Sequence, residues 1–223
     1  MKLVAAVRWA TLAVAWALPG FMPVPAAADA TGAAPAAAAK FNEIPPTPDL
    51  LDQVRNGGFV LYMRHGRTDS TKPDRYPSVD LNDCSTQRPL TPDGVAMAAE
   101  VGQAIRKAGI PLGEIRISPL CRVKDTVAAG FPNQPYIIDN FLIYTANLTD
   151  DEKVPILANT RRQLSEPVEV GRNRLLIAHA PNLMDLMGYF PAEGTLVIFR
   201  PKGAGAFDYL GSIPPSLWPS LLR

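Results

Sequence analysis

Short apolar runs alternate along the chain with segments whose apolar residues recur at helical spacing. Four apolar runs predict β-strands, at residues 59–63, 114–118, 136–139 and 173–180. The amphipathic segments predict helices, at residues 48–55, 91–108, 120–129, 149–163 and 182–190. Two later runs, at residues 195–201 and 206–213, predict a terminal hairpin.

This order of strands and helices predicts an α/β fold. The first strands are almost entirely apolar, which is typical of parallel strands that are buried on both faces. We therefore expect a three-layer sandwich, in which helices cover both faces of a mainly parallel central sheet. Ligands of such sheets bind beyond the carboxyl ends of the strands. The polar segment 66–90, which follows the first strand, has the length of a functional loop.

The N-terminus has the pattern of a secretory signal peptide. Lys2 and Arg8 flank the start of the chain, and the apolar run Trp9–Leu18 follows them. Ala26 and Ala28 then occupy the small-residue positions of a cleavage site. The alternative is an uncleaved membrane anchor. It is disfavoured because the apolar run has about half of the ~20 residues that span a bilayer.

We therefore expect residues 1–28 to be removed on bacterial export, which places the mature protein in the periplasm or outside the cell. Residues 29–47 are rich in alanine and proline and predict a flexible linker. Residues 48–223 then form a single folded domain.

The overall charge does not indicate a nucleic-acid or membrane partner. The formal net charge is +1, and hydrophobic residues make up 47% of the chain, as in ordinary globular proteins. No segment after the signal peptide is long and apolar enough to span a membrane. A local group of basic residues is therefore interpreted as a small-ligand site. The sequence is silent on the oligomeric state.

The chain has only two histidines, and each lies at the carboxyl end of a predicted apolar strand. His65 ends "VLYMRH" and His179 ends "LLIAH". A lone histidine in such a place is more often a core residue than a catalyst. If the two strands are neighbours, however, both imidazoles meet at one point above the sheet.

Arginines gather at the same strand ends. Arg64 and Arg67 flank His65, and Arg122 begins the helix after the second strand. A guanidinium is always charged and is costly to bury without a partner, and its forked donors match phosphate oxygens. Helix N-termini near Leu120 and Asn182 add backbone N–H groups. The pattern predicts a phosphate-binding site that contains an imidazole.

An imidazole inside a phosphate site predicts phosphoryl transfer. Neutral His65 can attack phosphorus and form a covalent intermediate, and His179, if protonated, is a further donor to the phosphoryl group. The sequence lacks H-E-x-x-H and C-x-x-C motifs. We therefore expect neither a metal site nor a cofactor.

Four motifs resemble the histidine phosphatase superfamily, also called phosphoglycerate mutase-like. They are "RHG", "LTPDG", "SPLCRVKDT" and "LIAHAPN", and they occur in the family's order across residues 58–200. The resemblance implies a phosphoglycerate mutase-like α/β sandwich. It implies that His65 is the phosphorylated nucleophile and that Arg64, Arg122 and His179 complete the phosphate pocket. The signal peptide indicates a small exported member.

The chain departs from the family at two positions. Arg67 stands where a glutamate often follows "RHG", which adds positive charge near the phosphate. Ala180 follows His179, where the acid phosphatase and phytase branch has an acidic proton donor, so this branch is disfavoured.

The mutase-like branch has a glutamate about one helix beyond the second arginine. Here that region holds Asp150, Asp151 and Glu152, of which we select Glu152 as the general acid. The alternative is that this group only caps a helix N-terminus. Glu193 and Asp185 are further candidates.

The loop "DLNDCSTQRPLT" resembles the rim of the pocket in small exported members, with Arg88 at the rim or simply solvated. The two cysteines, Cys84 and Cys121, pair in a disulfide or remain separate buried thiols. A bridge would fix the rim beside Arg122.

These observations favour an exported, metal-independent phosphoric monoester hydrolase that acts on a small phosphorylated substrate through a phosphohistidine. A phospholigand-binding module of the same fold, without turnover, is the alternative. A purely structural domain is a third reading. The sequence does not identify the substrate.

Overall fold

The computed structural model describes residues 40–75 and 77–223. The predicted signal peptide and residues 29–39 of the predicted linker lie outside the described residues. Within the described ranges, none of the helices is both long enough and apolar enough to cross a membrane.

A six-stranded sheet forms the centre of the molecule, with the strand order β3-β2-β4-β1-β5-β6. The strands are β1 (Val60–Arg64), β2 (Leu112–Ile117), β3 (Ile137–Ile138), β4 (Asn173–Ala178), β5 (Leu196–Gly203) and β6 (Ala206–Ile213). The first four strands are parallel to one another, and β5 and β6 form an antiparallel hairpin at one edge. The predicted mainly parallel sheet is therefore confirmed.

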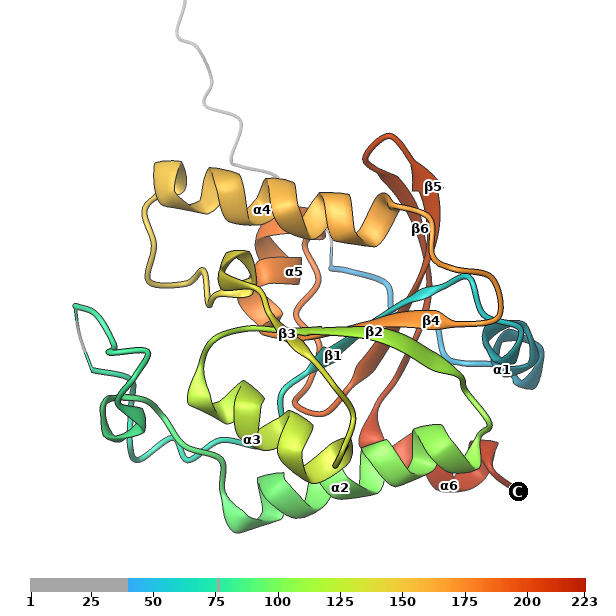
Figure 1. Ribbon diagram of the computed structural model, residues 1–223, viewed down its shortest axis with the longest axis horizontal. Coiled ribbons are helices and arrows are strands. Elements are labelled where there is room, and N and C mark those ends of the chain that lie inside the picture. The colour runs from blue at the N-terminus through green and yellow to red at the C-terminus, as the bar shows by residue number, and fades with distance from the viewer. Residues whose placement is uncertain (1–39, 76) are drawn as a thin grey trace, which may run out of the picture. The chain divides into compact units, whose positions relative to one another are not determined.

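Helices cover both faces of this sheet, which gives the predicted three layers (Figure 1). One layer holds α2 (Pro92–Lys107), α3 (Cys121–Gly130) and α6 (Trp218–Leu221), and α4 (Asp150–Ser165) and α5 (Ala180–Met187) form the opposite layer. The helix α1 (Pro48–Arg55) packs into the same core as α2 and α3. Three short 3-10 helices lie at Cys84–Thr86, Asn140–Leu142 and Pro215–Leu217.

The apolar character of the central strands reflects burial on both faces. On β1, Leu61 and Met63 pack into the core beneath α2 and α3, whereas Val60 and Tyr62 pack into the core beneath α4 and α5. Charged side chains are costly to bury within such a strand, so Arg64 and His65 come where the strand ends.

The end of the predicted linker packs against the folded domain. The ring of Phe41 stacks on Tyr189 at 4.3 Å, and the Ser212 N–H donates to the carbonyl of Ile44 at 3.0 Å. Residues 40–47 have no regular secondary structure, as expected of a linker, but they belong to the compact unit. The folded domain therefore begins before residue 48.

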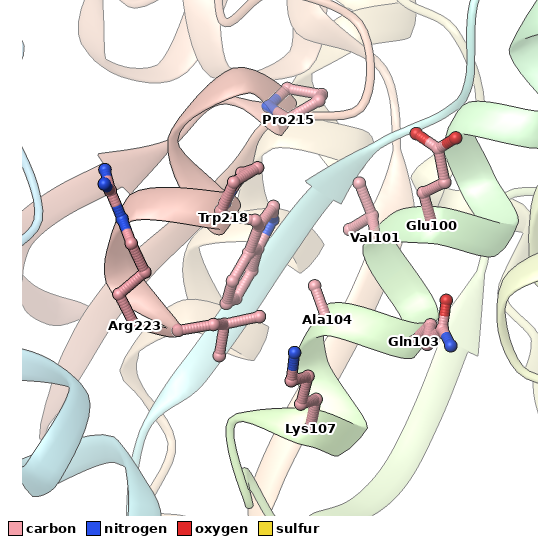
Figure 2. A pocket seen from close by; sticks show the side chains of 10 residues that line it. Glu100, Val101, Gln103, Ala104, Lys107, Pro215, Trp218 and Arg223 are labelled. Atoms are coloured by element: carbon pink, nitrogen blue, oxygen red, sulfur yellow. The ribbon is translucent and has the colours of Figure 1, made fainter.

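The C-terminal segment leaves a pocket of about 430 Å³ against α2. Figure 2 shows Trp218 and Arg223 on one side of it, and Val101, Ala104 and Lys107 of α2 on the other. Its lining residues all belong to α2 and to the chain after Ile213. It is therefore separate from the strand ends that carry the histidines.

A disulfide joins Cys84 in the loop before α2 to Cys121 at the start of α3, with the two Cα atoms 5.7 Å apart. Of the two alternatives for the cysteines, the structure has the bridge. It fixes the loop beside Arg122, the residue that follows Cys121.

We expect replacement of both cysteines by serine to lower the free energy of unfolding by about 2–4 kcal/mol. The reason is that the bridge closes a loop across a sequence separation of 37 residues and so restricts the unfolded chain. Urea unfolding of the oxidised protein and the double variant measures this difference. An unchanged midpoint and slope would contradict it.

Candidate active site

The two histidines meet at the carboxyl ends of β1 and β4. These strands are parallel neighbours in which Arg64 pairs with Ala178, so the residues that follow, His65 and His179, emerge side by side. Their ring centroids are 5.3 Å apart, and both side chains are buried. The sequence analysis expected the two imidazoles to meet if their strands are neighbours. The strands are neighbours, and the imidazoles do meet.

The hydrogen bonding of His65 leaves one ring nitrogen free. Its Nδ1 lies 2.8 Å from the carbonyl oxygen of Gly66. Because a carbonyl oxygen can only accept, Nδ1 carries the proton of the neutral ring and Nε2 keeps its lone pair. Glycine is required after His65 because a Cβ at Gly66 would lie 2.4 Å from the carbonyl oxygen of Gly94.

His179 is held by a serine on the neighbouring strand end and by a tyrosine of β1. Its Nε2 lies 2.8 Å from Ser118 Oγ, and the Tyr62 hydroxyl donates to the His179 carbonyl at 2.7 Å. Ser118 Oγ also accepts from Leu120 N–H at 3.5 Å, so its own hydrogen is available for Nε2. The ring proton of His179 is then on Nδ1, which has no partner among the described residues.

Burial and positive charge keep both rings neutral. Burial lowers the pKa of His65 well below its ordinary value, and the charge of Arg122 lowers it further. Burial, Arg122 and His65 likewise lower the pKa of His179. His179 is therefore neutral at pH 7, and any donation to a ligand comes from Nδ1–H of the neutral ring rather than from an imidazolium.

Arg122 is the most deeply buried cation at this place. Its side chain has 0% exposure, and Nη1 donates to Asp74 Oδ1 at 2.9 Å. The guanidinium also lies over the ring of Tyr144, at 5.3 Å from the ring centroid, and that ring meets His179 edge-on at 5.5 Å. Asp74 and Tyr144 therefore fix Arg122 beside the two imidazoles.

Two more arginines reach the same place. Arg64 donates from Nη1 to the carbonyl of Pro191 at 2.7 Å, and its Nη2 is 3.7 Å from Glu193 Oε1. The charge of Arg88 lowers the pKa of both histidines, which places this predicted rim residue within electrostatic reach of them. We refer to His65, His179, Arg64, Arg88 and Arg122 as the His–Arg cluster.

Several donors of the His–Arg cluster are buried and unused. Among the described residues no hydrogen-bond acceptor reaches Nε of Arg64, Nε of Arg88, or Nε and Nη2 of Arg122. Buried N–H groups without a partner are rare, and they are costly. An oxyanion with several acceptor oxygens satisfies donors that converge in this way.

The structure places two predicted site residues elsewhere. Arg67 is 52% exposed, and its Nη1 lies 3.8 Å from Asp93 at the start of α2. Glu152 is exposed and completes a capping box with Thr149, from which it accepts hydrogen bonds. These bonds lower the pKa of Glu152, which favours the carboxylate and disfavours it as an acid. The capping role that the sequence left open is the one observed.

Of the other candidate carboxylates, three lie at or near the start of α4 and one reaches the His–Arg cluster. Asp150 and Asp151 lie in the first turn of α4 with Glu152, and Asp185 pairs with Lys153 at 3.2 Å. Glu193 alone reaches the His–Arg cluster, through Arg64, and it also accepts from Thr68. Asp74, which the sequence analysis did not select, is the second carboxylate there.

Sequence reasoning also missed the residues that hold the histidines. Tyr62 lies three positions before His65 within β1, and Ser118 directly follows β2 and precedes "PLC". A hydroxyl on a buried strand, or just after one, is the signal that could have identified both. Among the described residues there is no group of three or more His, Cys, Asp or Glu side chains that could hold a metal ion.

Fold and site together define an α/β protein in which two neutral histidines and three arginines with unpartnered donors meet at the strand ends. Solved structures that are similar to this chain include the protein histidine phosphatase SixA complexed with tungstate (17% identity, TM-score 0.49, 71% of this chain and 97% of that one). They also include a phosphoserine phosphatase mutant from Entamoeba histolytica in complex with phosphoserine (14%, 0.48, 70% and 97%). A third is the alpha-ribazole phosphatase from Shigella flexneri (14%, 0.46, 70% and 96%).

The names of these three structures are those of phosphatases, and at 14–17% identity the similarity concerns the fold. A scan of family models and a search of curated proteins gave no match. The chemistry that we assign to the chain rests on its own residues.

We expect the free energy of unfolding to fall as the pH drops below about 6.5, the ordinary histidine pKa. In that range the unfolded histidines take up protons while the buried rings stay neutral, so stability is present at higher pH and lost toward acid. The slope reaches about 1.4 kcal/mol per pH unit for each histidine. Urea unfolding between pH 7.5 and 5.5 measures it. His179→Gln should reduce the slope by half, and an unchanged slope in that variant would contradict the assignment.

Proposed function

We propose that this protein is a phosphoric monoester hydrolase of the histidine phosphatase type, and that His65 is its nucleophile. The observation that carries the proposal is the hydrogen bond from His65 Nδ1 to the Gly66 carbonyl. It leaves a neutral Nε2 lone pair beside three guanidinium groups with unused donors. A fixed lone pair next to converging donors is what attack on a phosphoryl group requires.

The reaction has two steps. Nε2 of His65 bonds to phosphorus while the bond to the leaving oxygen breaks, and that oxygen takes up a proton. A water molecule then attacks phosphorus, the electron pair of the P–N bond returns to Nε2, and inorganic phosphate is released. The guanidinium groups of Arg64 and Arg122 and Nδ1–H of His179 stabilise the equatorial oxygens in both steps. The residues require no metal for either step.

We further propose that the protein acts after export, in the periplasm or outside the cell. The signal-peptide pattern of residues 1–28 supports this. The Cys84–Cys121 bridge supports it as well, because disulfides persist in oxidising compartments. We expect phosphatase activity in the periplasmic or extracellular fraction of cells that express the full chain, and not in their cytosol.

One observation favours a second candidate, a module that binds phosphorylated ligands without turnover. Glu152, the predicted proton donor, is exposed and engaged by Thr149. If no other group supplies the proton, binding would remain and turnover would not.

Hydrolysis of p-nitrophenyl phosphate, with and without EDTA, separates these functions. We expect turnover that EDTA does not reduce, and rapid quenching with labelled substrate should trap phosphate on His65. Phosphate binding without turnover would support the second candidate. Loss of turnover in EDTA, restored by a divalent metal, would contradict the metal-independent reaction.

A further inference from the structure

Asp74 brings a carboxylate into the His–Arg cluster from the loop between β1 and α2. Its Oδ1 accepts from Arg122 Nη1 at 2.9 Å and from the backbone N–H of Arg88 at 2.8 Å. The side chain is 7% exposed. The contact with Arg88 ties the loop position of Asp74 to the same segment that the disulfide fixes, so this carboxylate is held rather than free in solution.

A pocket of about 180 Å³ lies directly beside Asp74. The loop before α2 and the segment before α4 form most of it, and apolar side chains make up most of its wall. The lining residues are Asp74, Pro77, Ser78, Val79, Leu81, Leu120, Ile143, Tyr144, Asn147 and Leu148. Asp74 is the only charged residue among them.

The pocket and the His–Arg cluster share their boundary. Asp74 lines the pocket and pairs with Arg122, and Tyr144 lines the pocket and contacts both Arg122 and His179. Leu120, at the N-terminal end of α3, is two residues from Arg122. A group bonded to a phosphate held by Arg122 would therefore extend past Asp74 and into the pocket.

We propose that this pocket binds the leaving group of the substrate, an uncharged alcohol with an aromatic or compact apolar body, and that Asp74 transfers the proton to its oxygen. The proposal rests on the function proposed above and adds the substrate class and the proton donor. A cavity of roughly 150 Å³ lined by apolar side chains binds benzene, so this pocket has the size for one ring.

The proton balance follows from the position of Asp74. In the free protein the Asp74 carboxylate pairs with Arg122. A phosphate ester that binds as its monoanion brings one proton, and this proton passes to Asp74 as the phosphate oxygens replace Asp74 at Arg122. When Nε2 of His65 attacks, Asp74 gives this proton to the leaving oxygen as the P–O bond breaks. Asp74 is then a carboxylate, and it takes a proton from the water that attacks the phosphohistidine.

The same carboxylate sets the specificity. A substrate with a second anionic group close to its phosphate would place that group against Asp74 and an apolar wall, where it has no cation to pair with. We therefore expect phenyl phosphate to be a better substrate than 3-phosphoglycerate, measured as kcat/KM.

Two aryl phosphates of nearly equal size test the proton transfer. Asparagine at position 74 keeps the acceptor for Arg122 but cannot give a proton. We expect Asp74→Asn to reduce kcat/KM by about 10²–10⁴-fold for phenyl phosphate, whose phenolate is a poor leaving group. For p-nitrophenyl phosphate, whose phenolate leaves without a proton, the expected loss is under about tenfold. Equal losses for both substrates would overturn the role of Asp74.

Charge reversal inside the pocket tests the binding site. Leu81→Asp should lower kcat/KM for phenyl phosphate about tenfold or more and leave the inhibition constant of inorganic phosphate unchanged. Val170→Asp, at a position that is 93% exposed, is the matched control and should change neither. If Leu81→Asp left kcat/KM for phenyl phosphate unchanged, the pocket assignment would be overturned.

These outcomes are distinct from failure of the proposed function. If the protein hydrolyses neither aryl phosphate and no phosphate is trapped on His65, the proposed function itself is overturned. If both are hydrolysed through His65 and the two variants behave like the parent protein, only the inference about Asp74 and the pocket is overturned.

Discussion

Replacing His65 by alanine is expected to reduce turnover of p-nitrophenyl phosphate by roughly 10⁴-fold or more, because the variant lacks the atom that bonds to phosphorus. Binding should persist, since Arg64, Arg122 and His179 remain. We therefore expect the dissociation constant of inorganic phosphate in the variant to lie within about tenfold of the value in the parent protein.

Two controls make the result specific to nucleophilic attack. His179→Ala removes a donor but not the nucleophile, so its loss should be near the ~10²–10³ typical of one preorganised donor. The space left in His65→Ala lies above a fixed carbonyl at Gly66, and added imidazole should restore part of the activity. If His65→Ala retained turnover within tenfold of the parent, His65 would not be the nucleophile.

The fold could be predicted from the sequence because its signals are local. Central strands such as β1 and β4 are mostly apolar, and Thr91 and Thr149 sit at the N-caps of α2 and α4, where the sequence placed the helix starts. The helix α6 was not predicted, because its four residues are too few for a helical period to show. The strand order also lay beyond the sequence, since it depends on how the connections cross the sheet.

The site residues that could be predicted from the sequence are those that lie at or just after the end of a strand. His65, His179, Arg64 and Arg122 each come directly at or just after a buried strand, and the parallel sheet brings such positions together. Glu152 was selected by its distance along the chain, which does not fix a position in space. A cap and a catalytic acid look alike in the sequence, and only the contact with Thr149 separates them.

Asp74 could not have been selected from the sequence for a related reason. Asp69, Asp80 and Asp83 lie in the same loop as Asp74. All four belong to the polar segment 66–90, so nothing in the sequence distinguishes Asp74 from the other three. Asp69 and Asp83 accept hydrogen bonds from Thr71 and Ser85 two residues ahead, as turn-forming aspartates do. Asp74 instead pairs with Arg122, 48 residues away, through the tertiary fold of the loop.

Arg122→Ala is expected to reduce both activity and stability. The loss of the most deeply buried cation of the cluster should cost about 10²–10³ in kcat for p-nitrophenyl phosphate. It also leaves the nearly buried Asp74 carboxylate without its partner, which should lower the free energy of unfolding by about 3–5 kcal/mol. Arg122→Lys keeps the charge but not the forked donors, and its activity should lie between those of the parent protein and Arg122→Ala.

A second substitution separates these two effects. In the Asp74→Asn background, Arg122→Ala no longer leaves a buried charge without a partner. The free energy of unfolding of the double variant should therefore lie within about 1 kcal/mol of that of Asp74→Asn alone. The activity on p-nitrophenyl phosphate, which Asp74→Asn largely spares, should remain low. Arg106→Ala is the matched control, because Arg106 donates to the Gly130 carbonyl between α2 and α3 and to no other group that the structure describes. It should lower stability without reducing kcat. Recovery of activity together with stability in the double variant would mean that Arg122 acts only by holding Asp74, and that the phosphate binds elsewhere.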